Sequence, residues 1–214
     1  MRTEEINNLR ERRLAAAETV AALQLHYARA GRGLAEVALA GARTLEPLRH
    51  YPARDVVDPA RGTRFYYHAH TSRRYPAEEH GHFHLFVYPS GQPSGPDFFH
   101  LAGLSLDARG MPLRWFTTNR WVTGERWHSA DALLDALPRF AIETRGRLAP
   151  LARWLTAMVQ LYAPQIRALI LRRDARIARK LSQTPGEALF EDRRLDVVSE
   201  CRVSLPQTLA QIAG

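Results

Sequence analysis

Six of the chain's nine histidines lie between positions 68 and 100, and five of them stand in steps of two. Side chains two residues apart in a β-strand point to the same face. His68 and His70 are therefore expected to share one face of a strand, and His80, His82 and His84 one face of the next. Imidazole nitrogen suits zinc, iron and copper, so this spacing predicts a transition-metal site.

Whether the two histidine sets meet depends on the register between their strands. If the strands form an antiparallel hairpin with 70 near 80, His68 lies opposite His82, and opposed Cβ atoms stand about 4.5–5.5 Å apart. Imidazoles so placed converge on one ion, about 2.0–2.1 Å from each nitrogen. A slip of one residue would put the sets on opposite faces. The predicted metal ligands are His68, His70, His80, His82, His84 and, if its strand is adjacent, His100.

The residues around the histidines suggest which ion and which chemistry. Histidine ligands with carboxylates nearby suit zinc, iron or copper, whereas magnesium and calcium prefer oxygen ligands. Glu78 or Glu79 is expected to serve as ligand or general base, and we assign the catalytic role to Glu79. Arg114, Asn119 and Arg120 are predicted to orient an anionic group of a small-molecule substrate. The polar loop 90–97 is expected to act as a lid.

Helical periodicity marks the N-terminal part of the chain. Apolar residues recur at three- and four-residue steps over 3–29 and again over 34–46. The glycines at 31 and 33 separate the two segments, which predicts a helical hairpin within residues 1–50. Residues 51–62, rich in Pro and Gly, are expected to form an irregular connector.

A change to period two at Thr63 predicts the sheet. Strands are expected near 65–70, 81–88, 98–106 and 113–118, with a further short one at 121–122. Between the histidines stand apolar residues such as Phe83 and Leu85, so one sheet face is expected to pack on helices while the other carries the histidines. The sheet, of about four to six antiparallel strands, occupies 63–127.

The C-terminal part, 129–214, is predicted to be mainly helical. Ser129 has the side chain of an N-cap, and the longest helical stretch is expected over 151–181. Pro138, Pro150 and Pro164 are expected to break or kink the helices. Residues 195–205 alternate enough to add one more strand. The chain is thus predicted to be one α+β domain, 1–214, in which an N-terminal helical hairpin and C-terminal helices flank a central antiparallel sheet, the C-terminal helices packing on one face.

Composition narrows the function classes. No run approaches the roughly eighteen apolar residues of a membrane span, and the charged N-terminus lacks a signal-peptide pattern, so a cytoplasmic protein is expected. The lone Cys201 excludes an internal disulfide and a cysteine zinc site. A net charge of +8 raises nucleic acid as a partner, but Lys180 is the only lysine and the arginines are spread along the chain. A solvated surface is the simpler interpretation, and the number of subunits stays open.

The histidine segment is similar to motifs of two known families. His80-Gly81-His82-Phe83-His84 resembles the signature of the histidine triad nucleotide hydrolases, which implies His82 as a nucleophile; here the motif stands in mid-chain rather than near the end of a small domain. The stretch from Gly62 to His70 resembles the opening of the first cupin motif. Arg74 and Tyr75 occupy the places of that motif's glutamate, and His100 lacks the asparagine that would follow it.

The run from Phe65 to Phe86, with its Tyr-Tyr-His-x-His and Glu-His-Gly-His-Phe-His elements, also resembles an uncharacterised bacterial domain family. The similarity extends from the N-terminal helices to the C-terminal ones and implies no activity. Three hypotheses follow. The first is a metal-dependent enzyme, an oxidoreductase or hydrolase, acting on a small molecule. The second is a non-catalytic binder or sensor of metal or haem, and the third, ranked lowest, is a basic nucleic-acid-binding protein.

Overall fold

The second of the two N-terminal helices is shorter than expected. The computed structural model describes residues 3–70, 76–91, 95, 97–183 and 186–213. Helix α1 (Thr3–Arg29) has its predicted bounds, but α2 (Leu34–Ala38) ends eight residues before the expected 46. Ala40 and Gly41 follow it with φ of 54° and 93°, a left-handed conformation that cannot continue a helix. The hairpin is therefore one long helix followed by a single short turn of helix.

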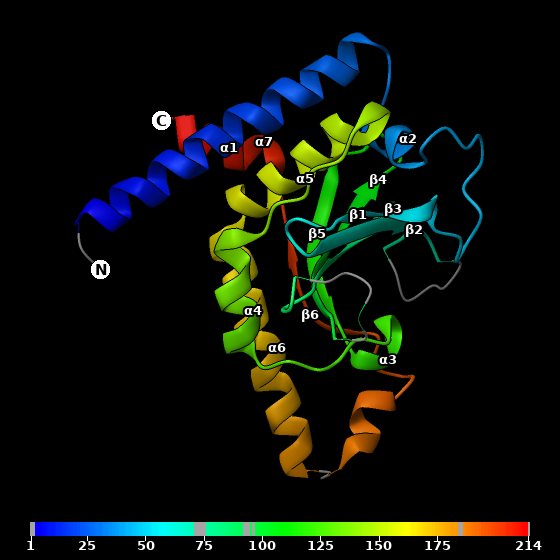
Figure 1. The fold of residues 1–214 in the computed structure, drawn as a ribbon, viewed down its shortest axis with the longest axis vertical. Helices are drawn as coiled ribbons and strands as arrows, with labels where there is room; N and C mark the ends of the chain where they lie inside the picture. Colours follow the sequence, from blue (N-terminus) through cyan, green and yellow to red (C-terminus); the bar gives the residue numbers. More distant parts are fainter. Residues whose placement is uncertain (1–2, 71–75, 92–94, 96, 184–185, 214) are drawn as a thin grey trace.

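The sheet has six antiparallel strands in sequence order. They are β1 (Tyr51–Asp58), β2 (Thr63–His68), β3 (Glu79–Val87), β4 (Phe99–Asp107), β5 (Pro112–Thr118) and β6 (Val197–Arg202). The predicted strand within 195–205 is confirmed as β6, which pairs with β5 across almost eighty intervening residues. Figure 1 shows that β1–β3 run across the direction of β5 and β6, so the sheet is strongly coiled.

Two local predictions about the sheet were wrong. Residues 51–58, expected as a connector, form the edge strand β1, where Pro52 is tolerated because an edge strand needs fewer ladder donors. The expected strand at 121–122 lies instead in the short helix α3 (Arg120–Thr123), whose N-cap is Asn119. A tight turn follows β4: the Gly110 N–H donates to the Asp107 carbonyl, and Gly110 has a φ of 84°.

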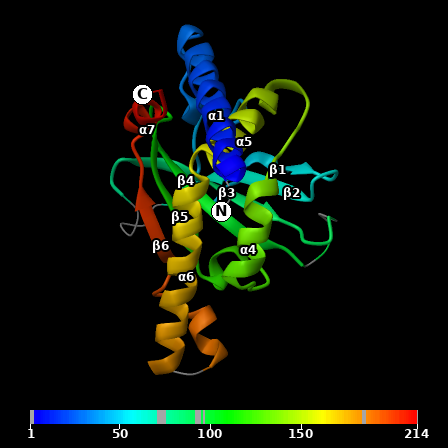
Figure 2. The ribbon, with the colours of Figure 1, turned by 90° about the vertical axis from the view of Figure 1, so that its left-hand side faces the viewer.

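Helices cover one face of the sheet. After α4 (Ala130–Ala136) and the 3-10 turns η1 (Leu137–Arg139) and η2 (Gly146–Leu148) come α5 (Ala149–Leu161) and α6 (Ala163–Gln183). The long helical stretch expected over 151–181 is divided at Tyr162, close to Pro164, where a break or kink was expected. η3 (Glu187–Glu191) and the terminal α7 (Leu205–Ala213) complete the chain. In Figure 2, α4 and α6 lie in front of the strands.

The core lies between these helices and the apolar sheet face. Phe65, Phe83 and Leu85 are fully buried, as the alternation predicts. The Phe83 ring stands 6.4 Å from the indole of Trp154 on α5. Burying one such side chain contributes about 1.5–3 kcal/mol, so this face anchors the sheet to the helices.

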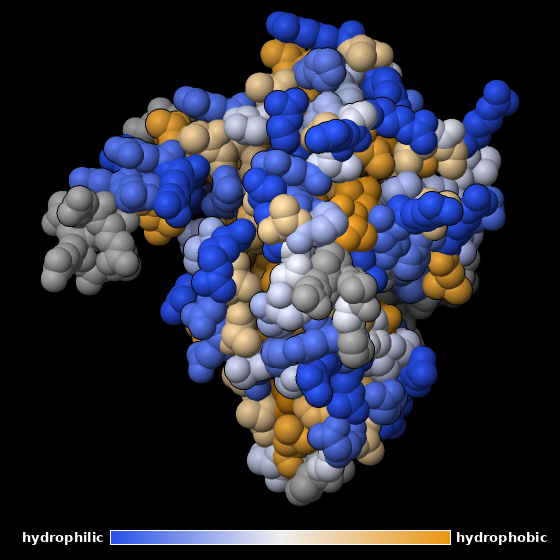
Figure 3. Space-filling view, viewed as in Figure 1, coloured by the Kyte–Doolittle hydropathy of each residue, from blue (hydrophilic) through white to orange (hydrophobic). Residues whose placement is uncertain are grey.

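The outer surface is mainly hydrophilic, with apolar side chains in small separate groups on the face shown in Figure 3. Within the part of the chain that the structure describes, no helix is both long and apolar enough to cross a membrane. The sheet face opposite the core is the one that carries the histidines.

Candidate metal centre

The strand register brings the two histidine sets together. In the β2–β3 pair His68 lies opposite His82, and Tyr66 lies opposite His84. This is the register that the hairpin argument predicted. β4 is adjacent to β3, with His100 opposite Phe86, so the third strand adds its histidine to the same face. The histidines at 68, 82, 84 and 100 therefore form one cluster.

The distances within the cluster would allow three of its side chains to hold a metal ion. One ring nitrogen from each of His68, His82 and His84 can be chosen so that the three lie within 4.8 Å of one another. Nε2 of His84 is 3.1 Å from Nε2 of His68. Two nitrogens bound to one tetrahedral zinc ion stand about 3.3 Å apart. These three side chains are thus placed to hold an ion with little rearrangement.

Burial keeps the imidazoles neutral. Desolvation, reinforced by the neighbouring histidines, lowers the pKa of His68 to about 2 and the pKa of His84 well below its ordinary value. Burial and the charge of Arg173 lower the pKa of His100 to about 3. His70 lies at the edge of the cluster, 5.2 Å from the His82 ring, and burial lowers its pKa to about 4. Neutral imidazole is the form that binds a metal, and the lowered pKa values keep His68, His84 and His100 in that form at neutral pH.

A β-bulge removes His80 from the cluster and puts Glu79 in its place. Along β3 the partner changes from Asp107 for Glu79 to Leu106 for Gly81, so His80 is an extra residue in the ladder. His80 lies on the other side, where its Nδ1 is 2.9 Å from the Tyr67 hydroxyl. The expectation that His80 shares a face with His82 and His84 is not met in the structure.

Glu79 braces His82. Its Oε1 accepts a hydrogen bond of 2.6 Å from Nδ1 of His82, and its Oε2 lies 3.4 Å from the guanidinium of Arg114. Burial by itself raises the pKa of Glu79, but the hydrogen bond from His82 and the charge of Arg114 together lower it below its ordinary value. An ionised Glu79 holds the proton of His82 on Nδ1, so Nε2 is the ring nitrogen of His82 that could bind a metal.

A second chain of hydrogen bonds supports His84. Its Nδ1 is 2.9 Å from Nε2 of His100, and Nδ1 of His100 is 3.0 Å from the Thr118 hydroxyl. With Thr118 as the acceptor, both rings carry their proton on Nδ1, and Nε2 of His84 is left to face His68. The carboxylate of Glu125 accepts a 2.6 Å bond from the backbone N–H of His100, and burial raises the pKa of Glu125 to about 7. Neither Thr118 nor Glu125 had a sequence signal.

The ring of His50, which no sequence feature marked as part of the site, lies beside the cluster. It stacks on Tyr66 at 3.7 Å and stands 5.7 Å from the His68 ring. Nδ1 of His50 is 2.9 Å from the carboxylate of Asp55. Asp55 comes from the segment expected as a connector, and His50 directly precedes that segment, so recognising β1 was the missing step.

The predicted substrate-binding residues are already paired with other protein groups: Arg114 lies on β5, and Asn119 and Arg120 lie at the start of α3. Arg114 makes a short ion pair with Glu200 in addition to its contact with Glu79. Arg120 pairs with Glu187 and Glu191, and Asn119 donates to the carbonyl of Leu189. Asn119 and Arg120 thus hold η3 against the end of β5; their binding role, like that of Arg114, stays a prediction.

Two other regions bear on the site. The predicted lid, 90–97, includes residues 92–94 and 96, which lie outside the described part of the chain.

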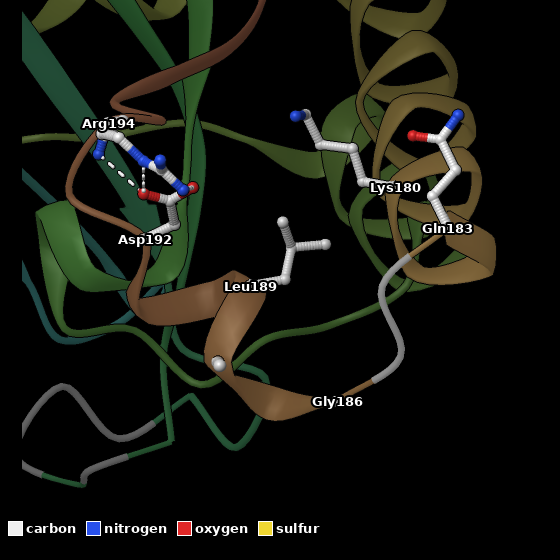
Figure 4. A pocket seen from close by; sticks show the side chains of 7 residues that line it. Lys180, Gln183, Gly186, Leu189, Asp192 and Arg194 are labelled. Atoms are coloured by element: carbon white, nitrogen blue, oxygen red, sulfur yellow. Dashed lines mark hydrogen bonds and ion pairs between the residues drawn. The ribbon is translucent and has the colours of Figure 1, made fainter.

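A separate pocket of about 390 Å³ lies between the end of α6 and η3 (Figure 4). Its lining includes Lys180 and Leu189, and its Asp192 and Arg194 pair with each other at 3.0 Å. It has no histidine, so it is distinct from the candidate metal centre.

Fold and site together define an α+β protein whose antiparallel sheet carries a buried imidazole cluster. The chain belongs to the family described as Domain of unknown function (DUF6969), whose model matches residues 14–203. The similarity to an uncharacterised domain family is thereby confirmed over most of the chain. No curated protein and no solved structure matches it. The function must therefore be argued from the geometry of the cluster.

Proposed function

We propose that this protein binds one transition-metal ion through His68, His82 and His84. The observation that carries the proposal is the set of three buried imidazoles with ligand nitrogens within 4.8 Å. Burying three neutral imidazoles against one another is unfavourable unless their nitrogens find partners, and a metal ion supplies one partner for all three. The carboxylate behind His82 and the His100 ring behind His84 are the supports that metal-bound histidines use.

The donor set favours zinc. Three nitrogens with one remaining position is the arrangement of catalytic zinc sites, and copper is the second choice. Iron held by two histidines and one carboxylate would need Glu79 as a ligand. Both oxygens of Glu79 face protein cations or donors, which argues for Glu79 as a positioning residue for His82 instead.

Elemental analysis of untagged protein tests the proposal. Protein with the natural side chains should carry about one ion per chain or take one up with micromolar affinity or better. The variant His82→Ala/His84→Ala should lose this uptake. A matched control, His26→Ala/His128→Ala, also removes two imidazoles but none from the cluster, and it should bind as the parent does. Equal uptake by the two double variants would contradict the proposal, with thermal unfolding showing that each is folded.

We further propose that the ion serves catalysis on a small molecule. A site with three protein nitrogens leaves a coordination position for water or substrate. The alternative, a non-catalytic metal binder, is favoured by the ring of His70, which stands 4.6 Å from the His68 ring, close enough to compete for that position. Cobalt-substituted protein separates the two, because azide should bind an open position and change the cobalt spectrum. If azide does not change the cobalt spectrum, the enzyme hypothesis fails and the non-catalytic metal binder remains.

A further inference from the structure

A second polar group of residues lies on the histidine face, around Arg64. In β2, Arg64 points to the same face as Tyr66 and His68 because the three alternate along the strand. Its guanidinium carbon is 4.4 Å from the centre of the Phe86 ring and 4.8 Å from that of Phe98. The Tyr88 ring is 5.6 Å away. The faces of the guanidinium are therefore covered by aromatic rings, and its edges carry the N–H groups.

The donors of Arg64 are not used within the described part of the chain. Its nearest acceptor there is Oδ2 of Asp55 at 3.5 Å, which is an ion-pair distance rather than a hydrogen bond. Nε of Arg64 is buried and has no hydrogen-bond partner among the described residues. A desolvated charged donor without an acceptor is unfavourable, and a ligand that accepts from it removes that penalty.

Asp55 joins Arg64 to His50. One carboxylate oxygen faces Arg64, and the other is 2.9 Å from Nδ1 of His50. Since the carboxylate accepts, the proton of His50 lies on Nδ1, and the ring is held against Tyr66. The side chains of Arg64 and His50 are 21% and 39% exposed, whereas His82 and His84 are buried, so this pair lies at the solvent edge of the histidine face.

We infer that Arg64, with His50 beside it, is a binding subsite for an oxyanion, the carboxylate or phosphate group of a small molecule. A guanidinium edge offers two parallel N–H groups that match two oxygens of such a group. The aromatic rings hold the guanidinium in one orientation and lower the local dielectric, which strengthens those hydrogen bonds. The inference rests on Arg64 and Asp55 and not on a bound metal. Because Arg64 lies on the histidine face, a ligand bound there would have its anionic end beside the proposed ion.

Calorimetry on metal-free, full-length protein tests the subsite, with inorganic phosphate and acetate titrated in separate arms. At least one of the two should bind at one anion per chain, and the tighter one identifies the group. Arg64→Gln should weaken binding about ten- to hundredfold, the effect of losing a hydrogen bond to a charged group. Arg64→Lys, which keeps the charge but not the two-point geometry, should weaken it by a smaller factor. Arg61→Gln is the matched control, since Arg61 lies three residues away and pairs with Asp58 and Glu143.

The possible results separate cleanly. Loss in both Arg64 variants with binding kept in Arg61→Gln supports the subsite. No binding of either anion, unchanged binding in Arg64→Gln, or an equal loss in Arg61→Gln would overturn it. If Arg64→Gln does not fold, Arg64→Lys decides alone. Because no metal is present, failure of metal uptake leaves this result unaffected, and failure of anion binding leaves the metal proposal standing.

Discussion

Glu79 and His82 are joined by a 2.6 Å hydrogen bond although they stand three positions apart in one strand. Side chains at such a spacing normally point to opposite faces of a sheet. The bulge at His80 inserts one residue into β3 and thereby turns Glu79 to the face of His82. One irregularity in the backbone thus exchanges a predicted ligand, His80, for a carboxylate that accepts a hydrogen bond from His82.

The first prediction concerns this carboxylate. Glu79→Gln removes the charge that holds the proton on Nδ1 of His82, so metal affinity should fall about ten- to hundredfold. Glu78→Gln is the matched control, because Glu78 is half exposed and only 3.8 Å from Arg202 in a weak surface pair. Competition with a coloured chelator measures both. Parental affinity in Glu79→Gln would refute the orienting role, and complete loss of uptake would make Glu79 a ligand.

The second prediction concerns His80. Its ring contacts the Tyr67 hydroxyl on the core side of the sheet. His80→Ala should therefore leave the metal stoichiometry and affinity unchanged, while stability falls by about 1 kcal/mol through the lost hydrogen bond. Metal titration and chemical denaturation give the two numbers. A variant that no longer takes up metal would mean that His80 ligates after all and that the bulge is absent in solution.

The third prediction separates positioning from ligation at His100. If His100 acts through Nδ1 of His84, His100→Gln should still bind one ion, but about ten- to hundredfold more weakly. Thr118→Val, which removes only the hydroxyl at the end of the same chain, should show a smaller loss in the same direction. X-ray absorption then counts the nitrogen ligands. One nitrogen fewer in His100→Gln than in the parent would show that His100 is itself a ligand.

The fourth prediction concerns acid stability of the metal-free protein. The pKa values of His68 and His100 are lowered to about 2 and about 3, so both stay neutral in the folded chain at pH 5 while the unfolded chain binds protons. Their stabilising contribution is complete above pH 6.5 and is lost progressively as pH falls towards 3. At pH 5 each is expected to have lost about 2 kcal/mol.

Glu125 acts in the opposite direction. Its pKa is raised to about 7, so its contribution is fully present below the ordinary glutamate value of 4.5 and is lost as pH rises through 7. Between pH 7 and pH 5, protonation of Glu125 in the folded chain offsets about 2 kcal/mol of the stability that the histidines lose. His84 adds a further loss in acid, so the free energy of unfolding should still fall by at least about 2 kcal/mol, as denaturant titration at the two pH values would measure. An equal or higher value at pH 5 would contradict buried neutral histidines.

Much of the sheet could be predicted because its signal is local. The alternation of histidine with Phe83 and Leu85 assigns one face to the core, and the fully buried apolar face confirms it. The same alternation restricts the register, since a slip of one residue would bury the wrong set. The pairing of His68 with His82 followed from that restriction together with the assumption that residues 70 and 80 are neighbours in an antiparallel hairpin.

Other features depended on contacts between distant segments. β1 became a strand because its partner β2 supplies the ladder, although Pro52 and its flanking residues have weak strand propensity. The end of α2 was set by left-handed residues at 40 and 41, which helical periodicity does not show. For β1 the pairing with a neighbouring strand decided the structure, and for α2 a left-handed backbone angle did. Local residue periodicity predicted neither.

The sequence by itself determined that imidazoles gather on one face of an antiparallel sheet, because residue type and period two are properties of the local chain. Only the tertiary structure decided which of them meet. The bulge in β3 is defined by its pairing with β4, and it exchanged His80 for Glu79. The approach of His50 is defined by the edge strand, and it stands 5.7 Å from His68. Such choices rest on backbone pairing between segments separated in sequence, which the spacing of residues within one segment does not encode.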